Sequence, residues 1–69
     1  MTSAKTYLDG VGVAFGNAEP KLTRANAQAQ GLVGCADQNA CDRLKNAAQA
    51  AEDMVKVSFA TVNYIRTRI

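Results

Sequence analysis

The sequence predicts an all-α protein: an antiparallel hairpin of two long helices that assembles into a helical filament or bundle. Two apolar stripes with helical spacing, separated by one glycine-containing turn, predict this hairpin. The chain has only 69 residues, and its 48% hydrophobic content includes no Trp, two Phe and two Tyr, so a single core buries little area. We therefore expect one domain, residues 1–69, that gains stability by sharing its surface with copies of itself.

The first arm covers about residues 3–30. Its apolar residues recur three and four positions apart, which places them on one helical face: Leu8, Val11, Phe15, Ala18, Leu22, Ala25 and Ala29. Pro20 takes the hydrogen-bond donor away from the Gly16 carbonyl, so the arm either kinks there or restarts with Asn17 as its cap. Three of the five glycines precede Asn17. We expect residues 1–16 to be less ordered than the rest, or ordered only by neighbours.

Residues 31–37 form the predicted turn. Gly31 suits the left-handed position that closes a helix, and Asp37 can cap the helix that follows. Cys35 and Cys41 either form a disulfide that staples the turn to the second helix or remain free thiols, with Cys41 in the core. Metal binding is the third alternative, although two thiols without His are too few for a structural zinc site. The disulfide requires that the protein leaves the reducing cytosol.

The second arm covers about residues 38–69 and contains no Gly or Pro, so it can be one continuous helix. Its main stripe consists of Cys41, Leu44, Ala48, Ala51, Val55, Ser58, Val62, Ile65 and Ile69. A flanking set widens the apolar surface beyond what one partner helix can cover: Ala47, Ala50, Met54, Val57, Thr61 and Tyr64. Each arm of about 30 residues would be roughly 45 Å long at 1.5 Å per residue. A strand at residues 55–59 is a weaker alternative, because the apolar alternation breaks at Ala60 and no second strand can pair with it.

The residues offer little to catalysis. The chain has no His, and its acids are scattered without converging on a site. The glycines lack the spacing of a phosphate loop or a dinucleotide fingerprint. We therefore expect a protein that is not an enzyme, without catalytic, cofactor-binding or metal-binding residues. No stretch reaches the roughly 20 apolar residues of a membrane span, and the N-terminus does not resemble a secretory signal. We expect synthesis in the cytoplasm and export to the cell surface or extracellular space without a cleaved signal peptide.

The C-terminal segment "AEDMVKVSFATVNYIRTRI" resembles the helix-turn-helix pattern of bacterial regulators. That resemblance implies a small DNA-binding protein that reads DNA with residues 58–68. In it, base edges would face Ser58, Phe59, Thr61 and Asn63, while Arg66 and Arg68 would contact phosphate. Nucleic acid is a partner only under this alternative, because the net charge of +2 is small for a domain that binds phosphate.

The N-terminal segment "YLDGVGVAFGNAEPKL" resembles needle subunits of type III secretion systems. The matching residues are Tyr7, Leu8, Asp9, Val11 and Phe15. The resemblance implies a helical hairpin that assembles into a hollow filament for protein secretion, with copies of itself and a secretion apparatus as partners. It also implies that the C-terminal helix lies toward the lumen, with Lys56, Arg66 and Arg68 at a lumen-facing or charged end. Arg66 and Arg68 also have a simpler interpretation, because the negative end of the helix dipole stabilises cations in the last turn.

Self-assembly and packing are assigned to one set of apolar residues: Leu8, Phe15, Leu22, Leu44, Val55, Val62, Ile65 and Ile69. If contacts between copies are heterologous and do not close, the product is a helical polymer. A hairpin that dimerises into a closed four-helix bundle would bury the same stripes and is the alternative.

Overall fold

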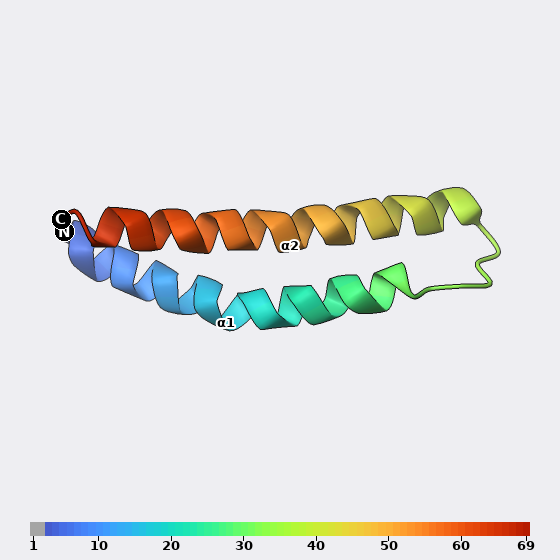
Figure 1. Cartoon of the computed structure of the whole chain (residues 1–69), viewed down its shortest axis with the longest axis horizontal. Coiled ribbons are helices and arrows are strands. Elements are labelled where there is room, and N and C mark those ends of the chain that lie inside the picture. The colour runs from blue at the N-terminus through green and yellow to red at the C-terminus, as the bar shows by residue number, and fades with distance from the viewer. Residues whose placement is uncertain (1–2) are drawn as a thin grey trace.

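The computed structural model describes residues 3–69 as two antiparallel helices, α1 (Ala4–Gln30) and α2 (Gln38–Arg66), joined by residues 31–37. Figure 1 shows the helices side by side, with the start of α1 and the end of α2 at the end of the hairpin opposite the turn. The molecule measures 50 × 18 × 17 Å. The prediction of an all-α hairpin is therefore confirmed, and α2 ends at Arg66 rather than at the chain end.

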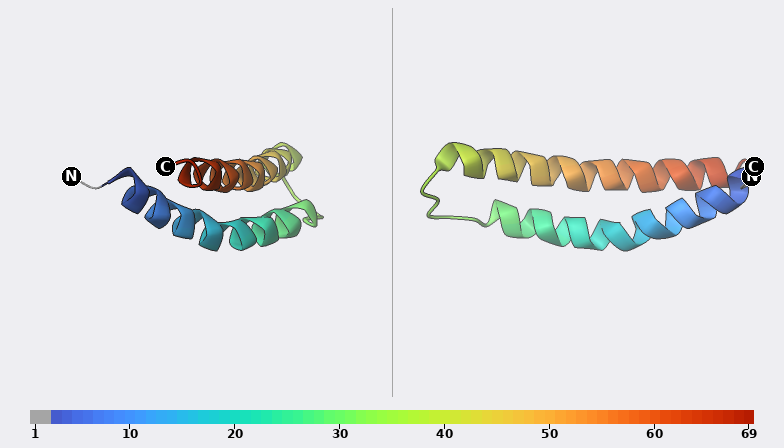
Figure 2. Two further views of the ribbon diagram at one scale, coloured as in Figure 1. Left: turned by 60° about the vertical axis from the view of Figure 1, so that its left-hand side comes forward. Right: turned by 180° about the vertical axis from the view of Figure 1, so that it is seen from behind.

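Helix α1 begins at a serine cap and continues through its proline. The Ser3 hydroxyl accepts a hydrogen bond from the Thr6 backbone N–H at 3.2 Å, which satisfies one of the free donors of the first turn. Pro20 lies inside the helix, so the predicted restart at Asn17 is wrong. Figure 2 shows that α1 bends while α2 is straighter, as expected for a proline that removes one backbone hydrogen bond. Residues 4–16, which were expected to be less ordered, are helical despite their glycines, and residues 1 and 2 of that prediction lie outside the described residues.

The turn differs from the prediction at Gly31 and agrees with it at Asp37, the cap of α2. Gly31 has φ −83°, so the left-handed conformation expected there is wrong. The reason is that α1 ends in a tightened turn, in which the Leu32 N–H reaches the Ala29 carbonyl at 3.1 Å. The left-handed residue is Gly34, with φ 73°. Asp37 caps α2 by accepting from the Ala40 N–H at 3.1 Å, as predicted.

Helix α2 is unbroken from Gln38 to Arg66. The strand expected as an alternative at residues 55–59 is therefore wrong. The same continuity removes the turn that a helix-turn-helix motif needs at Val55 and Lys56, and residues 58–66 belong to the same helix as the residues before them. Uninterrupted backbone hydrogen bonding, without Gly or Pro to end it, explains both outcomes.

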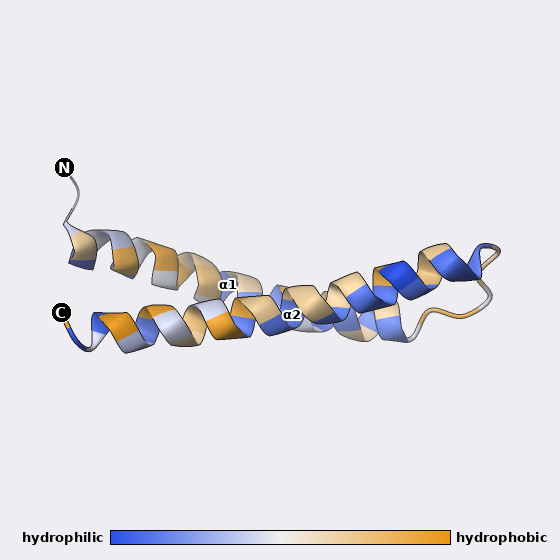
Figure 3. Cartoon of the chain, turned by 90° about the horizontal axis from the view of Figure 1, so that it is seen from above, coloured by the Kyte–Doolittle hydropathy of each residue, from blue (hydrophilic) through white to orange (hydrophobic). Residues whose placement is uncertain are grey.

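The interhelical contact changes in character along the hairpin. Figure 3 shows the more hydrophobic residues toward the chain ends and more hydrophilic ones toward the turn. Among the described residues, the buried apolar side chains are Val55 and Val62. Phe59 lies over Gly16, where an added Cβ would be 3.3 Å from the ring. The half near the chain ends therefore contains the larger apolar contacts.

Candidate functional site

The residues predicted to drive packing divide into two groups. Val55 and Val62 are buried between the helices, and Leu8, Phe15 and Leu22 are half-buried. The other three side chains are exposed in the hairpin: Leu44, Ile65 and Ile69. Packing within one chain thus uses the first group, and the second group stays accessible to other molecules.

The flanking set on α2 forms a continuous exposed strip, which we call the α2 strip: Ala47, Ala50, Met54, Val57, Thr61 and Tyr64. Met54, Val57 and Tyr64 are 64%, 61% and 58% exposed. Their spacing of three and four residues places them on one helical face. A single partner helix covers only part of the circumference of α2, so this face remains uncovered.

A polar layer lies between the helices in the half nearer the turn. Asn26 is buried and donates from Nδ2 to Glu52 Oε1 at 2.6 Å and to Gln49 Oε1 at 3.0 Å. Gln30 Nε2 donates to Asn26 Oδ1 at 2.9 Å and to the Lys45 carbonyl at 2.8 Å. Each buried polar group is thus paired, as burial requires. This layer was not predicted, because the apolar pattern assigned Ala25 to the interface, and Ala25 is exposed.

Glu52 carries a charge into this layer. Lys56 Nζ lies 2.8 Å from Glu52 Oε2. The hydrogen bond from Lys56, followed by the one from Asn26, lowers the pKa of Glu52 below its ordinary value. The same hydrogen bond to Glu52 raises the pKa of Lys56. Lys56, predicted as part of a charged or lumen-facing end, is therefore paired within its own helix.

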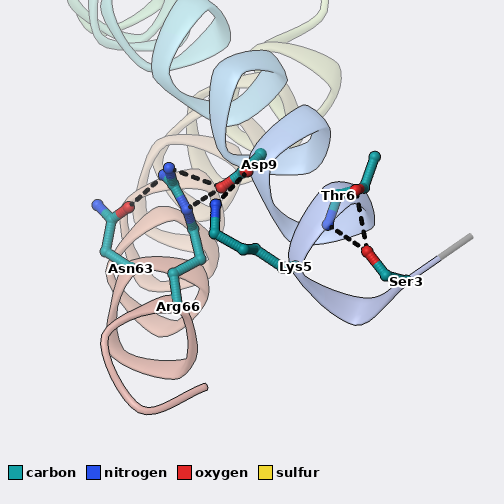
Figure 4. Close-up of polar contacts among 6 residues, drawn as sticks. All are labelled: Ser3, Lys5, Thr6, Asp9, Asn63 and Arg66. Carbon is teal, nitrogen blue, oxygen red and sulfur yellow. Dashed lines mark hydrogen bonds and ion pairs between the residues drawn. The ribbon is translucent and has the colours of Figure 1, made fainter.

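A second set of charges joins the helices at the chain ends (Figure 4). Arg66 Nε and Nη2 both lie 2.9 Å from Asp9 Oδ1, and Lys5 Nζ lies 3.1 Å from Asp9 Oδ2. Lys5 first, and Arg66 after it, lower the pKa of Asp9. Arg68 lies over the Tyr64 ring, 3.5 Å from its centroid. Arg66 thus connects the two helices, whereas Arg68, which follows the end of α2, contacts Tyr64 of that helix.

The residues of the DNA-reading alternative do not form one free face. Phe59 lies against Gly16, and Ser58 and Asn63 are half-buried. Asn63 Oδ1 accepts a hydrogen bond from Arg66 Nη1 at 3.4 Å. Thr61 is exposed, but its hydroxyl donates to the Val57 carbonyl at 2.7 Å. The side chains that the resemblance assigns to base edges are thus partly engaged within the hairpin.

The two cysteines are joined. Cys35 in the turn and Cys41 near the start of α2 form a disulfide, with their Cα atoms 6.5 Å apart. The staple is therefore the alternative that the structure contains, in place of free thiols. Residues 3–69 contain no group of three His, Cys, Asp or Glu side chains that could bind a metal ion.

No protein family, curated protein or solved structure matches the chain. Neither helix within residues 3–69 combines the length and apolar character needed to cross a membrane. The α2 strip is an exposed, largely apolar face that α1 leaves uncovered.

Proposed function

We propose that this chain is a structural protein that self-assembles through its long amphipathic helices, as a needle or pilus filament subunit for protein secretion. The observation that carries the proposal is the α2 strip, an apolar face that the hairpin leaves open. Contiguous apolar faces on soluble proteins mark contacts with other molecules. The N-terminal resemblance to needle subunits of type III secretion systems supports the choice of filament.

The small interior of the hairpin supports assembly as well. Its buried apolar side chains, Val55 and Val62, are few for a chain of 69 residues. A specific interface removes roughly 800 Å² from each partner. The hairpin exposes 4987 Å² in total, so one such contact would cover a substantial share of its surface. Contacts between copies can thus supply the burial that one copy lacks.

Two more exposed apolar side chains lie on the other helix, on different sides of it. Tyr7 and Val13 of α1 are each 63% exposed. A contact between the α2 strip of one copy and either of these side chains of the next would join two different surfaces. Such heterologous contacts propagate into a helical polymer when the rotation does not close a ring. Exposed apolar side chains on both helices support a proposal of heterologous contacts.

Export to the cell surface or extracellular space forms part of the proposal, with a secretion apparatus as a further partner. The Cys35–Cys41 disulfide supports it, because disulfides persist in oxidising surroundings and are rare in the cytosol. The proposed role is structural rather than catalytic.

The test is the size of the purified protein as a function of concentration, by light scattering and negative-stain microscopy. We expect wild type to form long uniform fibres. Val57→Glu places a charge on the exposed α2 strip without entering the hairpin interior, so it should abolish fibres while far-UV circular dichroism stays unchanged. Gln28→Glu is the matched control: it adds the same charge at an exposed position of α1 and should leave the fibres intact.

Two outcomes would contradict the proposal. A wild-type chain that stays a small discrete oligomer at every concentration would exclude the filament and favour the closed bundle. Fibres formed equally well by Val57→Glu would show that the α2 strip is not the contact surface.

A further inference from the structure

The disulfide lies at the turn end of the hairpin, where the large apolar side chains are exposed. Near the turn, Leu32 and Leu44 are partly or largely exposed, and Val33 is 86% exposed. From α1, Gln30 Nε2 donates a hydrogen bond to the Lys45 carbonyl in this region. Few buried apolar contacts and exposed backbone hydrogen bonds are the features of a segment that opens locally. The covalent bond is therefore the strongest constraint at this end of the molecule.

Two hydrogen bonds stabilise the start of α2, and the disulfide reinforces them. The Asp37 carboxylate accepts from the Ala40 N–H, and Gln38 Nε2 donates to Asp42 Oδ1 at 2.8 Å. Both interactions are exposed, so water competes with them. Cys41 lies one turn inside α2, and its bond to Cys35 fixes the chain on both sides of the Asp37 cap.

We propose that the Cys35–Cys41 disulfide is a redox-sensitive staple that determines whether the turn and the first turns of α2 are ordered. In the oxidised protein the turn is closed and α2 begins at Gln38. In the reduced protein residues 31–44 open locally, while the part of α2 around Val55 and Val62 stays packed on α1. The inference concerns the fold of one chain and is independent of filament formation.

The chemistry of the switch is thiol–disulfide exchange with a dithiol reductant. A thiolate of the dithiol attacks one sulfur of the protein disulfide, the S–S bond breaks, and a mixed disulfide forms. The second thiol of the reductant then displaces the other protein thiol. Two electrons and two protons pass to Cys35 and Cys41, and the dithiol becomes a disulfide. Both cysteines are half-exposed, which gives the attacking thiolate access.

The experiment measures amide hydrogen exchange by NMR on the oxidised protein and on the protein reduced with excess dithiothreitol. Closing a loop of about seven residues restricts the open chain by a factor of roughly 50. We therefore expect amides of residues 40–45 to exchange about 50-fold faster after reduction, with little change at residues 55–62. The double variant Cys35→Ser with Cys41→Ser should exchange like the reduced protein, with or without dithiothreitol.

Two results would overturn the proposal. If residues 40–45 exchange at the same rate before and after reduction, the disulfide does not order this segment. If reduction accelerates exchange equally along all of α2, the disulfide acts on global unfolding and no local switch exists. Because the reduced wild-type chain reports both results, the test does not depend on folding of the double variant.

Discussion

Three glycines of α1 face different surroundings, so replacing each with alanine tests the packing of the two helices. An alanine Cβ at Gly10 would meet nothing within 4 Å. At Gly12 it would lie 3.0 Å from Arg66 Nη1 and 3.4 Å from Val62 Cγ1. At Gly16 it would lie 3.3 Å from the Phe59 ring. The three substitutions gain the same helix propensity but differ in the contact that they create.

The expected changes follow from these distances. Alanine is favoured over glycine inside a helix by about 1 kcal/mol, so Gly10→Ala should raise the free energy of unfolding by about 1 kcal/mol. Overpacking a close contact costs roughly 1–3 kcal/mol. Gly12→Ala should therefore be neutral or destabilising, because Val62 is buried and the Arg66 guanidinium, which is paired with Asp9, must shift. Gly16→Ala should fall between the two, since its contact with Phe59 is less tight.

The assay is thermal unfolding followed by far-UV circular dichroism, at a dilution where the chain is monomeric. A change of 1 kcal/mol corresponds to a shift of about 4–8 °C for a domain of this size. Gly10→Ala should thus unfold several degrees above wild type, and Gly12→Ala should not. If Gly12→Ala gained as much as Gly10→Ala, the helices would not approach at that point and the register described here would be refuted.

Two further predictions concern pH and the hairpin interior. The pKa of Glu52 is lowered in the folded protein, so its contribution to stability is present above the ordinary value of 4.5 and is lost as pH falls through the lowered folded value. Acid unfolding of Glu52→Gln should show a weaker dependence on pH than wild type in that range, and an unchanged dependence would contradict the role of the polar layer. Val62→Asp places an unpaired charge between the helices, so the helical signal and assembly should both be lost, in contrast to Val57→Glu, which should lose assembly alone. A folded, assembling Val62→Asp variant would rule out the buried position of residue 62.

The helical hairpin could be predicted because its main signals are local. Apolar spacing of three and four residues repeats along both arms, and the glycines with Asp37 mark where the helices stop and start. The predicted position of the left-handed residue was wrong because Gly31 and Gly34 both suit that conformation. Only the hydrogen bonds at the end of α1 decide between them.

The polar layer could not be predicted from the same pattern. Counting apolar residues favours Ala25 as an interface residue, whereas the structure buries its neighbour Asn26. Asn26 is tolerated there because Glu52, Gln49 and Gln30 supply its hydrogen-bond partners, and two of these come from the other helix. The signal is therefore a relation between residues on different helices, which a single-helix periodicity does not contain.

The polar layer also explains how an alanine-rich hairpin has one register. Alanine stripes with a regular spacing bury nearly the same area when one helix slides along the other, so they discriminate weakly between registers. Such a slide would break the hydrogen bonds from Asn26 Nδ2 to Glu52 and Gln49 and leave this buried amide group without its acceptors, which is costly. We infer that the layer selects the register by penalising the alternatives. In that register Gly12 and Gly16 are the residues that face Arg66, Val62 and Phe59, where a side chain would prevent the close approach of the helices.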